Sequence, residues 1–156
     1  MTITTLGPGA VFGSESGSEE GDPANDASLA VHLRASGPGG ALNIMALGDL
    51  EESGQVALLT AWRADPALAA VAAQPVHVVK VAHHGSASQS IGLARALSPQ
   101  VALLSVGENT YGHPASRALN LYAQSATIVR TDDCGTAALT LREGQIMLAC
   151  TSSPRG

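Results

Sequence analysis

The sequence predicts an α/β fold in which a mixed β-sheet carries helices on one face. Its 156 residues suit a single domain, and a composition of 45% hydrophobic and 13% charged residues provides ample material for a core. Strand patterns occupy both ends of the chain, whereas helical and strand patterns alternate in the middle. A sheet covered by helices accommodates this order better than a helix bundle or a sandwich of bare sheets.

Three strands are expected near the N-terminus. Alternating side chains predict strands over Thr2–Leu6, Ser28–Arg34 and Ala41–Leu47, and Gly37-Pro38-Gly39-Gly40 makes the last two a hairpin. The run Gly13–Asp22 is rich in Gly, Ser and Glu and buries too little to offset its ordering entropy, so a flexible loop is expected there. The expected organisation is an N-terminal strand and loop over residues 1–24, a folded domain over residues 25–150 and a tail over residues 151–156.

Helices and buried strands are expected to alternate between residues 52 and 130. Apolar residues recur at helical intervals from Glu52 to Arg63. Nearly continuous apolar runs, which are typical of strands buried on both faces, occupy Val76–Ala82 and Val101–Val106. The other elements expected here are helices over Pro66–Ala73, Ser88–Leu97 and Pro114–Gln124 and a strand over Ala126–Arg130.

Two further strands are expected at the C-terminal end, over Thr136–Leu141 and Gln145–Ala149. If their turn is centred on Glu143, Thr136 lies opposite Cys150 and Cys134 is a diagonal neighbour of Cys150. Diagonal Cα atoms lie roughly 7 to 8 Å apart, at or beyond the reach of a disulfide. The sequence therefore predicts that the two cysteines remain unpaired.

The charge of the chain argues against one class of protein. A formal net charge of -5 is unsuited to a broad basic surface for nucleic acid, because phosphate neutralisation needs clustered lysine and arginine. The longest apolar runs fall far short of the roughly 20 residues of a membrane-spanning helix. Because Met1–Leu6 also lacks the features of an export signal, the chain by itself is expected to be soluble.

Three short polar motifs each follow a predicted strand. They are Gly48-Asp49-Leu50, His83-His84-Gly85-Ser86 and Tyr111-Gly112-His113-Pro114. Because open α/β sheets bind ligands at the carboxyl ends of their strands, these loops are expected to converge on one edge of the sheet. An aspartate with two or three histidines is a ligand set suited to zinc or manganese.

A purely structural interpretation is the alternative. In that interpretation Asp49 caps the helix that begins near Glu52, since aspartate is a favoured N-cap, and the histidines bond backbone groups at the strand ends. His32 and His77 lie within strand patterns without polar companions, and we interpret both as ordinary strand residues.

The order and spacing of four motifs is specific. The motifs are Gly48-Asp49-Leu50-Glu51, Val79-Lys80-Val81-Ala82-His83-His84-Gly85-Ser86, Ser105-Val106-Gly107-Glu108-Asn109-Thr110-Tyr111-Gly112-His113-Pro114 and Arg130-Thr131-Asp132-Asp133-Cys134-Gly135. Together they resemble the metallo-β-lactamase-like domain of the ComEC family of competence DNA-uptake proteins, over roughly residues 25 to 148. The resemblance implies a metallo-β-lactamase-like αββα fold, of which this chain supplies the C-terminal half only, and metal-dependent phosphodiesterase or nuclease chemistry.

The same resemblance implies roles for individual side chains. Asp49 matches the metal-bridging carboxylate, and either His83 or His84 matches the histidine ligand; spacing does not decide between them, and His83 is favoured. His84 and His113 are the expected catalytic residues, which would bind the phosphate or protonate the leaving oxygen. The side chains expected to line the substrate site are Ser86, Tyr111, Asn25 and Ser28. The implied cofactor is a divalent metal, zinc or manganese.

One departure from the family pattern limits these expectations. The first metal motif of the wider superfamily, His-x-His-x-Asp-His, is absent, and His32 is the only histidine before Asp49. The isolated chain is therefore expected to hold the metal weakly and to show little hydrolysis on its own. The alternative to an incomplete nuclease domain is a non-catalytic interaction module, or degenerate half-domain, that pairs with a partner supplying the first metal motif.

The resemblance also implies partners and a location. The expected partners are a DNA substrate and either the membrane channel part of a ComEC-type protein or a chain that carries the first half of the fold. The expected location is the outer side of the bacterial cell membrane. No transmembrane segment is expected within this chain.

Overall fold

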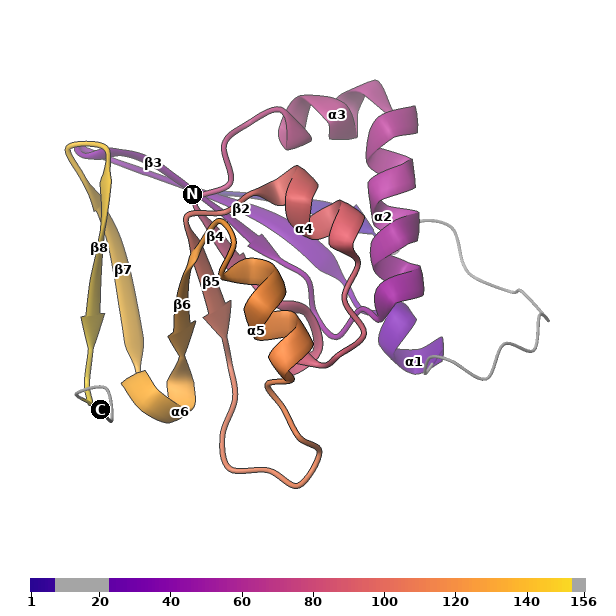
Figure 1. Cartoon of the computed structure of the whole chain (residues 1–156). Coiled ribbons are helices and arrows are strands. Elements are labelled where there is room, and N and C mark those ends of the chain that lie inside the picture. The colour runs from indigo at the N-terminus through magenta and orange to yellow at the C-terminus, as the bar shows by residue number, and fades with distance from the viewer. Residues whose placement is uncertain (8–22, 153–156) are drawn as a thin grey trace.

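A computed structural model describes residues 1–7 and 23–152 and contains a six-stranded mixed sheet in the order β1-β2-β3-β4-β5-β6 (Figure 1). The strands β1, β2 and β3 pair antiparallel, whereas β3, β4, β5 and β6 pair parallel. The run Gly13–Asp22, expected to be flexible, lies outside the described residues. The strands are β1 Thr2–Gly7, β2 Ala30–Gly37, β3 Gly40–Ala46, β4 Val78–Lys80, β5 Val101–Leu104 and β6 Thr127–Arg130.

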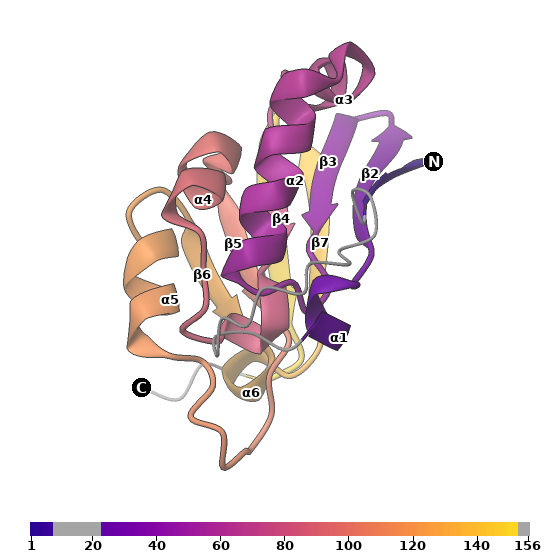
Figure 2. The same cartoon turned by 90° about the vertical axis from the view of Figure 1, so that its right-hand side faces the viewer.

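Helices cover one face of this sheet, as Figures 1 and 2 show for α2, α4 and α5. The α/β class and the mixed sheet expected from the sequence are confirmed. No helix within the described ranges has both the length and the apolar content needed to cross a membrane. The helices are α1 Pro23–Asp26, α2 Glu52–Ala64, α3 Pro66–Ala72, α4 Ile91–Leu97, α5 Ser116–Tyr122 and α6 Thr131–Cys134, with a short 3₁₀ segment η1 at Ala82–Gly85.

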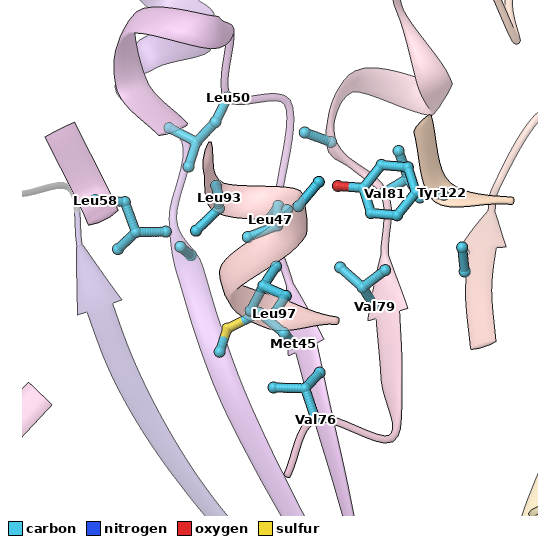
Figure 3. Close-up of a cluster of buried hydrophobic side chains, with 14 of the residues drawn as sticks. Met45, Leu47, Leu50, Leu58, Val76, Val79, Val81, Leu93, Leu97 and Tyr122 are labelled. Carbon is cyan, nitrogen blue, oxygen red and sulfur yellow. The ribbon is translucent and has the colours of Figure 1, made fainter. Parts of the chain in front are cut away.

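The larger core lies between the sheet and the helices (Figure 3). Successive side chains of a strand point to opposite faces, so Val79 of β4 points toward this core while Val78 points away. Met45 of β3 joins Val79, and Leu93 and Leu97 of α4 pack against them. These four side chains of the larger core are all less than 5% exposed, which makes this layer the rigid support for the loops at the strand ends.

The hairpin of β7, Ala137–Arg142, and β8, Gln145–Cys150, covers part of the opposite face of the sheet. It forms a second, two-stranded sheet and does not extend the first one. Its inward side chains, including Leu139 and Ile146, pack on Val78 of β4. The central strands are therefore buried on both faces, which explains their continuous apolar runs.

The prediction that the cysteines remain unpaired is wrong, because Cys134 and Cys150 form a disulfide with their Cα atoms 5.0 Å apart. The hairpin turn holds only Glu143 and Gly144, both with positive φ, and the resulting register places Ala137 opposite Cys150. The predicted register used a turn one residue longer. In addition, the segment before β7 is not extended, because the helical turn α6 and Gly135 at φ 70° bring Cys134 back toward the end of β8.

Candidate functional site at the carboxyl edge of the sheet

Three loops meet where the parallel strands end. Gly48 and Asp49 follow β3, η1 follows β4, and the loop of residues 105–115 follows β5. The His83 amide donates to the Gly48 carbonyl at 3.0 Å, and the Ala115 amide donates to the Gly85 carbonyl at 2.8 Å. The convergence expected from the sequence is observed, since these bonds join all three loops at one edge.

Asp49 lies between a lysine and a histidine. Its Oδ1 atom is 3.5 Å from Lys80 Nζ and 3.7 Å from His84 Nε2. Lys80 Nζ also donates to the Gly48 carbonyl at 2.9 Å, and the Ser28 hydroxyl accepts the Asp49 amide at 3.0 Å. Burial lowers the pKa of Lys80, and the neighbouring Asp49 carboxylate opposes that shift. Hydrogen bonds to Ser28 and Lys80 thus fix the backbone at Gly48 and Asp49, while the side chain of Asp49 is 42% exposed.

The N-terminus of α2 is capped by Asp26 and not by Asp49. Asp26 Oδ1 accepts the amides of Glu51 at 3.0 Å and of Gly54 at 3.1 Å, and Asp26 Oδ2 accepts the Ser53 hydroxyl at 2.5 Å. The structural interpretation in which Asp49 is the helix cap is therefore wrong. The carboxylate of Asp49 instead faces Lys80 of β4 and His84 of η1.

His84 is the histidine that the structure places beside Asp49. Its Nδ1 atom lies 2.5 Å from the Ser105 carbonyl oxygen, which can only accept a hydrogen bond. Nδ1 therefore carries a proton, and Nε2 is the ring nitrogen that faces Asp49. Histidines that bind metals usually donate their other ring nitrogen to such an acceptor, so His84 has the orientation of a metal ligand.

His83, the ligand favoured by the sequence, faces a different carboxylate. Its Nδ1 atom lies 2.7 Å from Glu51 Oε1, and that oxygen also accepts the side-chain amide of Asn25 at 3.1 Å. Glu51 is buried, with 8% exposure, whereas the His83 side chain is 26% exposed. The structure thus pairs His83 with Glu51 and His84 with Asp49.

The two histidines occupy strained backbone conformations. His83 has φ 44° and ψ 51°, and His84 has φ 53° and ψ 21°, both in the left-handed region. This region costs a residue with a side chain roughly 1–2 kcal/mol. Two consecutive residues of this kind are typical of functional sites, where strain positions side chains that a regular strand end would not.

Gly85 follows the strained pair, also at positive φ, and packs tightly. A Cβ atom there would lie 2.5 Å from Leu104 Cδ2 and 2.9 Å from Pro114 Cβ. Only glycine allows this turn and the close approach of the loop after β5.

Two buried glutamines, Gln55 and Gln89, form hydrogen bonds with the backbone of the loops at the strand ends. Gln55 of α2 donates to the carbonyls of Leu50 and Ser88 and accepts the Ser90 amide at 2.9 Å. Gln89 donates to the carbonyls of Ala82 and Ser86, both at 3.2 Å. These bonds tie the segment after Asp49 to the segment after the histidine pair, and both glutamines are fully buried.

His113 and Tyr111 complete the cluster from the loop after β5. The His113 ring lies 5.3 Å from that of His83, and the Tyr111 ring stacks on His113 at 6.2 Å between centroids. Burial and the nearby His83 and His84 lower the pKa of His113, with Glu51 opposing them. His113 Nδ1 is buried and has no hydrogen-bond partner within the described chain.

A pocket of about 480 Å³ opens beside these side chains. It is lined by residues of the loop after β5, including Glu108, Tyr111 and His113, together with His84 and Thr131. Of the residues expected to line the substrate site, Tyr111 lines this pocket. Ser86, Asn25 and Ser28 instead bond the Ser88 amide, Glu51 and the Asp49 amide, respectively.

Sequence reasoning missed three side chains that shape the site, namely Glu51, Lys80 and Asn109. Lys80 carries a usable signal, because it is the only lysine of the chain and lies inside an otherwise apolar strand. Glu51 stands within the Gly-Asp motif but was not assigned a role. Asn109 bonds only to its own loop, which no residue spacing reveals.

Within the described residues, the structure brings together only a pair of side chains that could bind one metal ion. Nowhere in residues 1–7 and 23–152 do three or more His, Cys, Asp or Glu side chains form a group able to hold a metal ion. Asp49 Oδ1 and His84 Nε2 are a pair of donors, and Lys80 already neutralises Asp49. Zinc in proteins takes four ligands, of which at least three come from the protein, so this pair alone does not fit.

The fold and the site define an α/β domain with a cluster of histidines and carboxylates at the carboxyl edge of its parallel strands. No protein-family model, no curated protein and no solved structure matches the chain. Its chemistry is therefore argued from the geometry of these side chains.

Proposed function

We propose that this chain is the C-terminal half of a metallo-β-lactamase-like domain that acts as a metal-dependent phosphodiesterase or nuclease in a ComEC-type DNA-uptake protein. The observation that carries the proposal is the 3.7 Å separation between Asp49 Oδ1 and His84 Nε2 at the strand ends. Two ligands of one tetrahedral zinc ion lie roughly 3.3 Å apart, so a small side-chain movement would let this pair share an ion. The remaining ligands would come from a polypeptide that carries the first metal motif.

The residues of this chain have distinct parts in that function. Asp49 and His84 supply two donors to the shared metal, zinc or manganese. The imidazole of His113 lies at the mouth of the pocket and donates a hydrogen bond to the phosphate or a proton to the leaving oxygen. Glu51 holds His83 in place through the 2.7 Å contact with its Nδ1 atom.

The disulfide supports the proposed location. Disulfides form and persist in oxidising compartments and are rare in reducing ones. The bond between Cys134 and Cys150 therefore suits a domain on the outer side of the bacterial membrane, where a DNA substrate would meet a membrane channel.

A second candidate function is a non-catalytic interaction module. The observation that favours it is that only two donors face each other while Lys80 neutralises one of them. Met147 and Leu148 of β8 are also exposed, at 49% and 42%, on the outer hairpin. Such a half-domain would bind a partner with the first half of the fold without cleaving DNA.

Cleavage of end-labelled single- and double-stranded DNA, with zinc or manganese, tests the proposal. The assay compares the chain alone, the chain mixed with a first half taken from a complete domain of the resembled family, and the mixture carrying Asp49→Asn or His84→Gln. We expect cleavage by the mixture only, reduced by about 100-fold or more in both variants. Asp65→Asn, at an exposed helix N-cap, is the matched control and should leave the rate unchanged.

Three other outcomes of this assay would each contradict one part of the proposed function. Cleavage by the chain alone that Asp49→Asn abolishes would show that the site needs no second half. Association of the two halves without cleavage would favour the interaction module over the nuclease. Absence of both association and cleavage would contradict the half-domain proposal itself.

A further inference from the structure

Tyr111 is the one exposed aromatic ring in the part of the chain that the structure describes. Trp62 and Tyr122 are 4% and 2% exposed and belong to the core, whereas Tyr111 is 83% exposed. Tyr111 also lines the pocket, so its exposed ring is available to a ligand bound there.

The loop holds Tyr111 in a fixed place. The side chain of Asn109 makes four hydrogen bonds within the loop: it accepts the amides of Tyr111 and His113, both at 3.1 Å, and donates to the carbonyls of Gly107 and His113. The Tyr111 and His113 rings are stacked, with an interplanar angle of 30°. One face of the tyrosine ring is therefore supported and the other is open to a ligand.

The pocket beside Tyr111 suits an uncharged group. Glu108 lines it, and no lysine or arginine does among the described residues. A carboxylate without a neighbouring cation repels a phosphate but can accept hydrogen bonds from an amino group. His113, the side chain proposed above to bind the phosphate, lines the same pocket, as does His84, the proposed metal donor.

We propose that Tyr111 stacks on an unpaired nucleobase, with its sugar in the adjoining pocket and its phosphate at His84 and His113. This inference rests on the proposed function and names its substrate as single-stranded nucleic acid. Bases within a duplex have both faces covered, whereas an unpaired base stacks on any exposed aromatic ring.

The charges of the chain favour the same substrate. The net charge is -5, and Arg117 and Arg130 are paired with Glu52 and Asp132. A chain with 8 lysine and arginine residues against 13 aspartate and glutamate residues gains little affinity from phosphates alone, so stacking has to contribute.

The test measures binding by NMR on the whole chain, followed at the ring signals of Tyr111, His84 and His113. The probes are dAMP, 2-deoxyribose 5-phosphate and inorganic phosphate. We expect dAMP to bind about tenfold more tightly than 2-deoxyribose 5-phosphate. Tyr111→Ala should make the two affinities nearly equal, and Tyr111→Phe, which keeps the ring, should preserve the preference.

The outcomes separate this inference from the proposed function. Equal affinities in the unmodified chain, or a preference that survives in Tyr111→Ala, would overturn the inference while binding of the sugar phosphate still supports the phosphate site. Shifts at Tyr111 with dAMP, without any response of His84 and His113 to the three probes, would support stacking and contradict the phosphate site. Absence of any shift would contradict both.

Discussion

His84 Nε2 faces Asp49 Oδ1 at 3.7 Å while its Nδ1 atom lies 2.5 Å from the Ser105 carbonyl. One imidazole thus joins the loops that follow β3, β4 and β5. The strained backbone at His84 is what turns the ring toward both neighbours, since a residue in extended conformation would continue the direction of β4. The same ring therefore links the geometry of the fold to the proposed chemistry.

Replacing the helix cap should destabilise the protein, and replacing the site aspartate should not. Asp26→Ala removes three hydrogen bonds at the start of α2, and we expect a loss of about 1 to 2 kcal/mol in the free energy of unfolding. Asp49→Asn removes partly exposed charge contacts with Lys80 and His84, which we expect to cost less than about 0.5 kcal/mol. Urea unfolding measures the free energy of unfolding of both variants. A larger loss in Asp49→Asn than in Asp26→Ala would indicate that Asp49 is the helix cap after all.

Asn109→Ala should loosen the loop that carries Tyr111 and His113. All four side-chain hydrogen bonds of Asn109 lie within that loop, so the amides of Tyr111 and His113 lose their acceptor. Hydrogen exchange at these two amides should become about tenfold faster or more, while the unfolding midpoint changes little. Asn120→Ala, on the exposed face of α5, is the control, and equal exchange in both variants would argue against this role.

The free energy of unfolding should decrease as the pH is lowered, because His32 has a lowered pKa in the folded protein. Its side chain is 4% exposed, and burial, with a smaller effect of Arg34, lowers its pKa below the usual value of about 6.5. The unfolded chain therefore binds a proton near pH 6.5 while the folded protein does not. The resulting stabilisation is complete above that pH and is lost as pH falls toward the lowered folded pKa.

His32→Leu removes this titration. Urea unfolding at several pH values between 7.5 and 5 should give a flatter decline for the variant than for the unmodified protein. Parallel curves would show that His32 titrates alike in the folded and unfolded states.

Reduction of the disulfide should weaken the hairpin that covers the second face of the sheet. The bond closes a loop with a sequence separation of 16 residues, for which chain entropy predicts a contribution of about 3 kcal/mol. Thermal unfolding with and without dithiothreitol should show a lower midpoint in the reduced protein. The double variant Cys134→Ser and Cys150→Ser should not respond to the reductant, and an unchanged midpoint in the unmodified protein would contradict the bond.

The sequence predicts the elements of this fold better than the contacts between them. Continuous apolar runs mark β4 and β5 because both faces of these strands are buried, by α4 on one side and the β7–β8 hairpin on the other. The disulfide was missed for a reason of geometry. A one-residue error in the turn at Glu143 shifts the whole register, and the helical turn before Cys134 leaves no periodic signal.

In the candidate site, too, the sequence predicts the positions of residues along the chain better than the contacts of their side chains. The placement of Asp49, His84 and His113 at one edge follows from their positions after parallel strands. The pairing of His83 with Glu51 does not, because it depends on positive φ values that sequence patterns assign to glycine and not to histidine. The assignment of Asp26 as the cap of α2 depends likewise on a tertiary contact between distant segments.

The amount of zinc or manganese bound per chain tests the central claim, that this chain supplies only part of a metal site. Elemental analysis after dialysis would compare the chain alone, its mixture with a first half, and that mixture with Asp49→Asn or His84→Gln. We expect little metal on the chain alone, at least one ion per complex in the mixture, and a loss of that metal in both variants. A chain that by itself retains one or more ions, or a mixture that retains none, would contradict the account.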